Sequence, residues 1–329
     1  MVRKLTEKEL LIESMSWQDY DTYASEVFSR FSGQFNQEIF YFTPPQFEKL
    51  SSLVSFTSWG HKSKPVLICL GGVANAARRF DYLASALSSD YHVVCPDWLG
   101  RGLSDWLAPE INYDLTAYVQ QIWQLIAHLN VPTVSILGSS MGASVALEII
   151  DQDPSLIDAL ILNDTGPFID ASCRSRRATT LAQDYVFRTP RDMMRKLGAS
   201  QKHDGPLPQS VRLHNAHALT RWSNEKGGRI YRHDPRAMVA YQIAAVGDVD
   251  QWAQWASVMC PVLVIRGMES NVFSLETLER MRSKPAMSVM HIPLTGHTPA
   301  LADPNHIEWI KDWLTHTGLP EKEFCAPYA

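Results

Sequence analysis

Hydrophobic runs alternate with amphipathic stretches over most of the 329-residue chain. Short runs rich in β-branched and aromatic residues are separated by Pro, Gly and Ser, a pattern typical of strands. These runs are EIFYF, SLVSFTSW, PVLICL and YHVVCPD. Helical stretches at Thr116–Leu129 and through Ile150 then alternate with the strand-like runs TVSIL and ALILND. This alternation predicts an α/β fold, with a parallel sheet covered by helices on both faces.

The pattern changes at residues 168–249, which are charged, helical in texture and without a convincing strand. After them PVLVIRG and MSVMHIP restore the strand pattern, and a helix near Pro304–His316 follows. We therefore predict three parts: an N-terminal helical arm (1–37), an α/β core (38–167 and 250–329) and a helical cap (168–249). The arm carries apolar residues among charges and is expected to pack on the core. Its apolar residues are Leu5, Leu10, Leu11 and Ile12.

Composition and charge narrow the class of protein. The chain is 45% hydrophobic and 20% charged, with a net charge of −5 and no long run of one sign, which argues against nucleic acid or an anionic membrane as a partner. No secretory signal and no apolar window of membrane-spanning length are found. Five scattered cysteines, two of them in strand-like runs, favour a reducing, cytoplasmic setting. The sequence leaves self-association open.

A candidate nucleophile lies in the stretch VSILGSSMGASVAL, residues 134–147. Gly138, Ser140 and Gly142 fit Gly-x-Ser-x-Gly at the point where a strand gives way to a helix, which is the context that a nucleophile elbow requires. Ser140 would stand at the corner, and Ser139 is expected to be structural. A plain strand–helix turn without chemistry is the alternative for the motif alone.

A base and two oxyanion donors are needed to activate such a serine. His297 follows Gly296 in the loop after the last strand-like run, whereas His291 lies within that run. The backbone N–H of Met141, directly after the nucleophile, is one expected donor. Val73 is the other, because the glycine pair before it lets the backbone approach closely, and Gly72 is therefore a predicted substrate contact.

These motifs together resemble the α/β-hydrolase superfamily, in particular a capped subgroup near the meta-cleavage-product hydrolases and related esterases. The resemblance covers residues 66–167 and 261–301 in the order LGGVANAARRF, VCPDWLGRGLSDW, LGSSMGA, ILNDTGP, PVLVIRG and GHTPAL. It implies a mostly parallel eight-stranded sheet with an inserted helical cap. It also implies that the turn around Asp97 is structural.

The third member of the expected triad departs from the family pattern. The loop after PVLVI reads Ser270-Asn271 where the family carries an Asp, and an Asn cannot stabilise the imidazolium by charge. Asp164, at the end of ILND, and Glu269 are the two candidate replacements. We favour Asp164, because a strand end is stiffer than a loop and some superfamily members place their acid there. A turn or N-cap role is the alternative for Asp164.

The predicted cap holds further candidates. Its apolar residues are expected to form mostly cap core, with Phe168, Tyr185 and Trp222 predicted to contact the substrate. Arg174, Arg176 and Arg177 fit either a contact to a substrate carboxylate or, as the pattern favours, a solvated basic face. His214 and His217 have helical i, i+3 spacing, but such a pair is more typical of a solvated or capping face, so no metal and no cofactor are predicted.

The sequence thus predicts a cofactor-independent serine hydrolase that cleaves an ester or thioester of a small apolar acyl or aryl substrate through an acyl-enzyme on Ser140. Hydrolysis of a carbon–carbon bond next to a ketone is the alternative chemistry, implied by the meta-cleavage resemblance. A hydrolase fold impaired by Asn271, which now binds a ligand or partner, is the alternative of another class.

Overall fold

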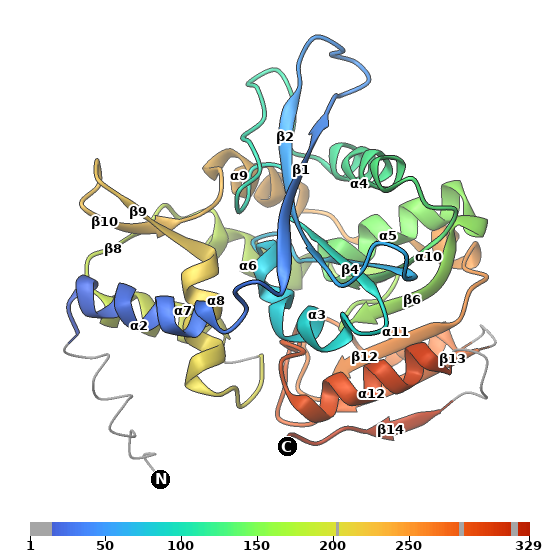
Figure 1. The fold of residues 1–329 in the computed structure, drawn as a ribbon. Helices are drawn as coiled ribbons and strands as arrows, with labels where there is room; N and C mark the ends of the chain where they lie inside the picture. The colour runs from blue at the N-terminus through green and yellow to red at the C-terminus, as the bar shows by residue number, and fades with distance from the viewer. Residues whose placement is uncertain (1–14, 202–203, 283–285, 317–321) are drawn as a thin grey trace.

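A nine-stranded, mostly parallel sheet forms the centre of the protein in the computed structural model, which describes residues 15–201, 204–282, 286–316 and 322–329. The strands lie in the order β1-β2-β4-β3-β5-β6-β12-β13-β14 (Figure 1). Strand β2 pairs antiparallel with both β1 and β4, and the other pairings are parallel. Their bounds are β1 (Phe35–Phe42), β2 (Ser52–Trp59), β3 (Val66–Leu70), β4 (His92–Pro96), β5 (Val134–Ser139), β6 (Ile157–Asn163), β12 (Val262–Gly267), β13 (Met287–Ile292) and β14 (Glu323–Cys325).

The predicted α/β class and mostly parallel sheet are confirmed, but the sheet has one strand more than the eight expected. The additional strand is β14, whose three residues pair in parallel with β13. Three residues are too few to give an alternating pattern, so the sequence carried no signal for this edge strand.

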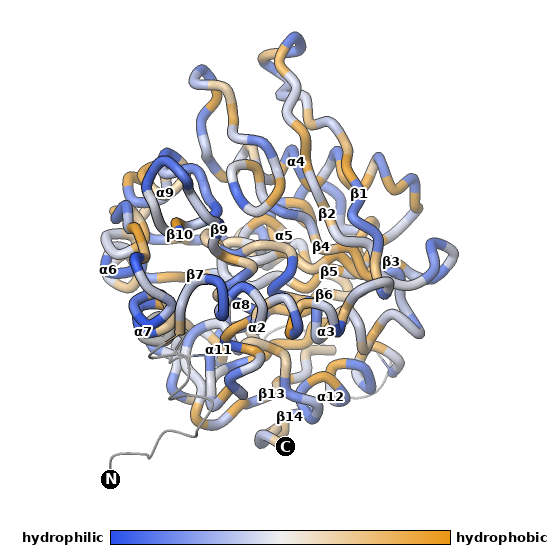
Figure 2. The backbone as a smooth tube through the Cα atoms, turned by 60° about the vertical axis from the view of Figure 1, so that its left-hand side comes forward, coloured by the Kyte–Doolittle hydropathy of each residue, from blue (hydrophilic) through white to orange (hydrophobic). Residues whose placement is uncertain are grey.

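Helices cover both faces of the sheet because the buried strands are apolar on both sides. Val66, Ile68 and Leu70 of β3 contribute to one core, and Leu67 and Cys69 to the other, as the period of two requires. The first core is closed by α4 (Leu115–Leu129), α5 (Met141–Gln152), α10 (Trp252–Ala256) and α11 (Leu275–Met281), and the second by α3 (Asp81–Leu87) and α12 (Pro304–Thr315). In Figure 2 the hydrophobic strands β3 to β6 lie inside the molecule.

Local capping explains where several helices begin and end. The Asp114 side chain accepts a hydrogen bond from the Ala117 N–H at the start of α4, and Asn130 ends that helix in the left-handed conformation with φ 52°. Two short 3₁₀ helices, Ala77–Phe80 and Pro154–Leu156, connect core elements.

Residues 168–249 form a separate layer beside the sheet, on the left of Figure 1. The helices of this inserted segment are α6 (Ala171–Leu181), α7 (Pro190–Gln201), α8 (Gln209–Leu219) and α9 (Pro235–Ala244). The expectation that it lacks strands is wrong. It holds a three-stranded sheet of β8 (Val186–Phe187), β9 (Thr220–Ser223) and β10 (Gly228–Tyr231), and β7 (Phe168–Ile169) pairs with β11 (Val249–Asp250) where the segment leaves and rejoins the core.

The strands that were missed are short and polar. The register of β9 against β10 pairs Ser223 with Gly228, and Gly227 in the connecting turn has φ 59°. A polar hairpin of this length has no alternation of apolar and polar residues strong enough to separate it from a loop.

The N-terminal arm packs on the inserted segment and not, as expected, mainly on the core. Its helix α2 (Trp17–Ser29) begins with a capping box between Ser16 and Asp19. Tyr20 and Ala24 are fully buried in a cluster with side chains of α7, α8 and β8. Strand β1 already begins at Phe35, two residues before the expected end of the arm. The apolar residues Leu5, Leu10, Leu11 and Ile12 lie outside the described residues.

No helix among the described residues combines the length and the apolar character needed to cross a bilayer. All five cysteines are free, and Cys69 and Cys95 are buried. The cytoplasmic location stays a prediction.

Candidate active site

Ser140 lies at a strained corner between β5 and α5. Its backbone has φ 53° and ψ −117°, outside the regions that L-residues ordinarily occupy. Gly138 and Gly142, on either side of Ser140, have no room for a side chain because backbone atoms of other residues lie too close. A Cβ on Gly142 would lie 2.3 Å from the Leu70 carbonyl oxygen, and one on Gly138 would lie 2.6 Å from the Ala143 backbone. The backbone N–H of Ser140 donates to Thr165 Oγ1 at 3.0 Å, which holds the corner against the end of β6.

His297 lies within hydrogen-bond distance of the serine although 157 residues separate them in the chain. Its Nε2 is 3.3 Å from Ser140 Oγ, and its Nδ1 is 3.0 Å from Asp164 Oδ2. Ser140, His297 and Asp164 therefore form a continuous chain of hydrogen-bond partners. His291, in β13, instead contacts Glu323 Oε1 at 2.8 Å.

The side chain of Asp164 is fully buried and accepts three hydrogen bonds. Besides His297 it accepts from the Gly267 N–H at 2.9 Å and from Ser270 Oγ at 2.6 Å. The pairing of β6 with β12 brings these groups together, because Asp164 follows β6 and Ser270 follows β12. The role of Ser270 was missed, since nothing local in the sequence shows which side chain it faces.

The other two candidate positions for the acid face elsewhere. The side chains of Glu269 and Asn271 are exposed, and the contact given for Asn271 is through its backbone carbonyl, which accepts from Cys173 Sγ at 3.0 Å. Of the three candidates weighed from the sequence, Asp164 is the one that reaches His297.

Burial sets the electrostatic state of the histidine. The side chain of His297 is 5% exposed, and this burial lowers its pKa below the ordinary 6.5. The hydrogen bond to Asp164 acts in the opposite direction, and the positive charge of Arg177 lowers the pKa further. The imidazole is therefore neutral near pH 7, as a base must be.

The backbone N–H groups of Val73 and Met141 are both available beside Ser140. Neither donates a hydrogen bond to another described residue. The Gly72 carbonyl, in the same peptide as the Val73 N–H, accepts from the Asn75 N–H at 3.0 Å, so the Val73 N–H points the opposite way. A Cβ on Gly72 would lie 3.6 Å from Ser140 Cβ, which places this loop directly against the serine.

Two buried side chains from the segment after β4 hold this loop. Trp98 Nε1 donates to the Gly71 carbonyl at 2.9 Å, and Arg101 Nε donates to the Val73 carbonyl at 2.9 Å. Asp97 accepts from the Ala77 and Leu103 N–H groups, and its burial raises its pKa to about 6. This agrees with a structural turn around Asp97, as the resemblance implied.

A cavity of about 700 Å³ opens beside Ser140, between the sheet and the inserted segment. This volume lies within the usual range for sites of small molecules. Val73, Ser140 and Met141 line it on the core side. Its other wall comes from the start of α4, from α9 and from the β7–β11 pair, with Tyr118, Ile169, Ala237, Tyr241 and Val249 among the lining residues.

None of the four predicted substrate contacts, Gly72, Phe168, Tyr185 and Trp222, is among the residues that line this cavity. Tyr185 packs against Phe187, and Trp222 packs edge-on against Trp17 of α2. Both lie in or beside the cluster under the arm, so their prediction as substrate contacts is corrected. The reason is that an apolar side chain in the inserted segment can face the arm as well as the core. Phe168, in β7, directly precedes the lining residue Ile169.

His214 and His217 of the inserted segment pack against aromatic side chains of α2. His214 is fully buried, stacks on Phe28 and lies 3.1 Å from Asp81 Oδ2, so the expectation of a solvated or capping face is wrong for it. Within the described ranges no group of three or more His, Cys, Asp or Glu side chains is placed to hold a metal ion.

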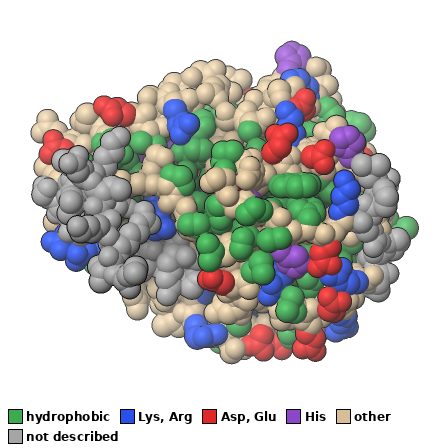
Figure 3. Space-filling model, turned by 90° about the horizontal axis from the view of Figure 1, so that it is seen from below, with side chains coloured by type: hydrophobic (Ala, Val, Ile, Leu, Met, Phe, Trp, Pro, Cys, Tyr) green, Lys and Arg blue, Asp and Glu red, His purple; other side chains and the backbone are tan. Residues whose placement is uncertain are grey.

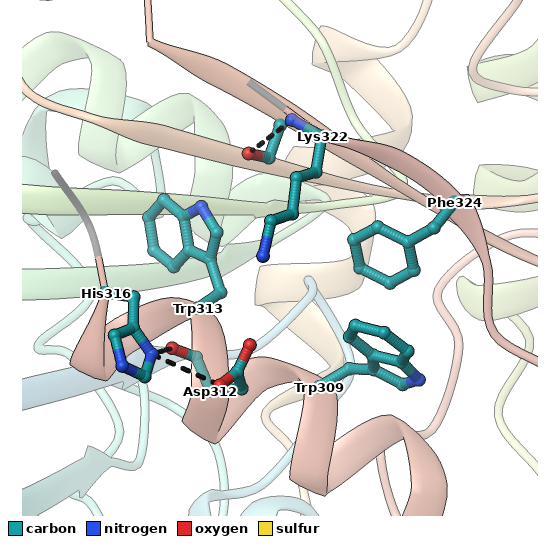
Figure 4. Close-up of a pocket in the computed structure, with 7 residues that line it drawn as sticks. Trp309, Asp312, Trp313, His316, Lys322 and Phe324 are labelled. Carbon is teal, nitrogen blue, oxygen red and sulfur yellow. Dashed lines mark hydrogen bonds and ion pairs between the residues drawn. The ribbon is translucent and has the colours of Figure 1, made fainter. Parts of the chain in front are cut away.

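A second hollow lies far from this chemistry. Figure 3 shows the molecule from below, the side on which Figure 1 places α12 and β14, and hydrophobic side chains gather across this face between charged ones. The hollow lies between Trp309, Trp313 and Phe324 and has a volume of about 20 Å³, which is room for about one water (Figure 4). It is too small for a substrate.

Comparisons with known proteins agree with this geometry. The family model described as "alpha/beta hydrolase fold" matches residues 64–304. The 3-hydroxybutyrate-oligomer hydrolase of Cupriavidus necator is 34% identical over 264 residues, 77% of this chain and 90% of that protein. An alpha/beta hydrolase from Novosphingobium aromaticivorans superposes with a TM-score of 0.75 at 27% identity, over 86% of this chain and 99% of that one.

A more distant solved structure shares the fold alone. E-2-(acetamidomethylene)succinate hydrolase superposes with a TM-score of 0.71 at 20% identity, over 85% of this chain and 100% of that one. The fold, the order of the motifs and the family match over residues 64–304 together show that the chain belongs to the α/β-hydrolase family.

Proposed function

We propose that this protein is a serine ester hydrolase that works through an acyl-enzyme on Ser140. The observation that carries the proposal is the continuous chain Ser140–His297–Asp164, with distances of 3.3 and 3.0 Å, at the wall of a cavity of about 700 Å³. A base within reach of a strained serine, oriented by a buried carboxylate, is the arrangement that nucleophilic acyl transfer needs.

In the first half of the reaction His297 Nε2 takes the hydroxyl proton as Ser140 Oγ bonds to the ester carbon. The negative charge moves to the carbonyl oxygen, where the Val73 and Met141 N–H groups stabilise it; removing one such donor typically costs about 3 kcal/mol of barrier. When the tetrahedral intermediate collapses, the bond from carbon to the alcohol oxygen breaks. That oxygen receives the proton from His297 and leaves as an alcohol.

In the second half a water molecule replaces the alcohol. His297 takes a proton from the water, whose oxygen bonds to the acyl carbon, and the proton then returns to Ser140 Oγ as the acid leaves. Asp164 holds the Nδ1–H tautomer throughout and stabilises the imidazolium. It supplies the carboxylate that the loop lacks at Asn271, which supports catalysis over a merely ligand-binding role.

We take esters of short hydroxy-acid oligomers as the preferred substrate class. The support is the 34% identity to the 3-hydroxybutyrate-oligomer hydrolase over 77% of the chain. The cavity beside Ser140 is mixed in character, with apolar residues of α9 and polar groups such as Glu148 and Gln251 in its lining. A mixed lining suits an acyl chain that carries its own ester and hydroxyl oxygens.

Labelling with a fluorophosphonate tests the chemistry independently of the substrate. We expect one covalent adduct on Ser140, located by peptide mass spectrometry, and none in Ser140→Ala. Ser139→Ala is the matched control one residue earlier and should still be labelled. Hydrolysis of p-nitrophenyl butyrate by the same three proteins should follow the labelling. An unlabelled wild-type protein that is folded by circular dichroism would contradict the proposal.

A further inference from the structure

Arg101 is a buried cation whose hydrogen bonds all go to neutral groups. Its side chain is only 1% exposed. Its Nε donates to the Val73 carbonyl at 2.9 Å, and its Nη1 donates to the Leu99 carbonyl at 2.8 Å and to the Tyr118 hydroxyl. Among the residues that the structure describes, no ion pair joins Arg101 to a carboxylate, and its Nη2 has no hydrogen-bond partner.

Two tyrosine rings flank this guanidinium, and the carboxylate that one of them contacts is already paired. The centroids of the Tyr113 and Tyr118 rings lie 5.6 and 5.0 Å from Arg101 Cζ. Burial raises the pKa of both phenols, so both stay neutral at pH 7 and neither supplies a negative charge. The Asp234 carboxylate accepts from the Tyr113 hydroxyl at 2.8 Å and forms its ion pair with Arg236 at 2.6 Å.

A buried charge of this kind destabilises the resting protein. The guanidinium has lost its hydration, and its neutral acceptors compensate for only part of that loss because none of them carries an opposite charge. The cost falls whenever a negative charge forms nearby. The reaction proposed above forms such a charge, since the carbonyl oxygen of the ester becomes an oxyanion beside the Val73 N–H.

The turn that carries Val73 is also held by its own backbone. The Gly72 carbonyl accepts from the Asn75 N–H at 3.0 Å, which closes a β-turn with Val73 and Ala74 at its centre. Ala74 does not have a positive φ, and turning the central peptide over would force one on this non-glycine residue. The backbone therefore already fixes the Val73 turn, and what Arg101 adds to it is mainly charge.

Standard geometry places the guanidinium close to the point where the oxyanion forms. Nε of Arg101 is 2.9 Å from the Val73 carbonyl oxygen, and both residues line the cavity beside Ser140. The N and O atoms of one residue are about 3 Å apart and a hydrogen bond spans about 3 Å, so the path from Nε to the oxyanion is roughly 9 Å at most. Unit charges at that distance, with an effective dielectric constant of about 20, interact strongly enough for about a 20-fold change in rate.

We propose that Arg101 supplies, from behind the Val73 turn, a positive charge that stabilises the oxyanion in both halves of the reaction. The proposal rests on the proposed function, because the oxyanion forms only when Ser140 or water attacks the carbonyl carbon. Arg101 touches no reacting atom and moves no proton. It is a positioning residue that acts through the Val73 turn and through the electric field of its charge.

Three substitutions of Arg101 separate its charge from its bulk. Arg101→Met and Arg101→Gln remove the charge, whereas Arg101→Lys keeps it. With p-nitrophenyl butyrate we expect both neutral variants to lose about 20-fold in kcat and in kcat/KM alike, with KM within about twofold of the wild type, as for an interaction made only in the transition state. Arg101→Lys should keep most of the wild-type kcat. Thermal unfolding checks that each variant is folded, and either neutral variant alone is enough for the comparison.

An inhibitor that becomes an oxyanion gives an independent readout. The carbonyl carbon of trifluoromethyl butyl ketone bonds to Ser140 Oγ, its oxygen takes the negative charge, and His297 holds the proton. We expect the neutral variants of Arg101 to bind this ketone more weakly by about the factor that they lose in kcat/KM. A merely structural role would not couple the two losses in this way.

Rescue of Arg101→Ala by a small solute tests the charge without a second side chain. Arg101 lines the cavity, so a solute can reach the space that truncation leaves. Guanidinium and urea are both planar and both carry N–H donors, but only guanidinium is charged. At about 50 mM, far below denaturing concentrations, and with ionic strength held equal by sodium chloride, guanidinium should raise kcat at least about fivefold and urea should not. The wild type is the control and should respond to neither solute.

Three results would overturn the proposal: a folded neutral variant of Arg101 that keeps more than half of the wild-type kcat, a loss that falls on KM alone, or guanidinium that restores Arg101→Ala no better than urea. Failure of the proposed function is distinguishable from these. In that case the wild type is neither labelled by fluorophosphonate nor active on p-nitrophenyl butyrate, whatever residue stands at position 101.

Discussion

Replacement of Asp164 by Asn is the most direct perturbation of the triad, because it preserves size and removes one charge. The native carboxylate accepts from Gly267 N–H through Oδ1 and from Ser270 and His297 through Oδ2. All three partners are donors to a fully buried group. An amide offers one acceptor oxygen and one NH₂ donor in the same space, so it can satisfy only part of this arrangement.

Each orientation of the amide has a calculable cost. With the oxygen toward Gly267, the NH₂ faces His297 and forces Nδ1 to accept. The remaining proton then sits on Nε2, and His297 can no longer take the proton of Ser140. The wrong tautomer of a triad histidine lowers kcat by about 10⁴, or about 5 kcal/mol in the barrier. With the NH₂ toward Gly267, two donors meet in a buried site, which costs about 1–3 kcal/mol of stability.

The first orientation is expected to be the stable one, so Asp164→Asn should stay folded and lose about 10⁴ in kcat. The assay is p-nitrophenyl butyrate hydrolysis together with the rate of fluorophosphonate labelling, and thermal unfolding checks the fold. Glu269→Gln and Asn271→Ala are the controls, since both side chains are exposed, and each should stay within about twofold of the wild type.

The reasoning is refuted if Asp164→Asn keeps more than a tenth of the wild-type kcat while remaining folded. It is equally refuted if Glu269→Gln or Asn271→Ala falls by orders of magnitude, because the working acid would then be in the loop after β12 and not at the end of β6.

Two further predictions follow from particular contacts. Gly142→Ala should lower both the melting temperature and the activity, although Ala favours helices, because the added Cβ would lie 2.3 Å from the Leu70 carbonyl oxygen. Overpacking of this kind costs about 1–3 kcal/mol of stability. Gly247→Ala is the control in the calorimetric measurement, because a Cβ at that position meets nothing within 4 Å. His297 acts as a base only when neutral, and burial together with the charge of Arg177 lowers its pKa, so kcat/KM should fall with acid only at a midpoint below 6.5. Arg177→Gln should move that midpoint to higher pH, and a midpoint at or above 6.5 in the wild type would contradict the assigned environment.

Short-range patterns were enough to predict the longer strands of the sheet, though not β14, and the strand–helix corner at Ser140. Local structure at residues 134–152 depends on features that are only a few residues apart: the hydrophobic period of two, the helix caps and the glycines around Ser140. The strand–turn–helix of this stretch could therefore be predicted before any tertiary contact was known. The late His297 could be predicted from its place after the last long strand, because chain order constrains which strand ends share an edge of the sheet.

Only the tertiary structure showed which side chains contact residues that are far away in the sequence. Whether Asp164, Glu269 or Asn271 faces the imidazole depended on the pairing of β6 with β12 and on the buried donors of Gly267 and Ser270. The amphipathic helices of the inserted segment have several neighbours to choose from, so local pattern could not tell that Tyr185 and Trp222 lie by the arm.

Arginines on one helix illustrate the same limit. Arg174, Arg176 and Arg177 are equivalent in the sequence, and only the docking of α6 against the core shows that Arg174 lines the Ser140 cavity while Arg176 and Arg177 are exposed. The physical reason is that propensity and period act over a few residues along the chain. The environment of a side chain is set by residues that may be more than a hundred positions away.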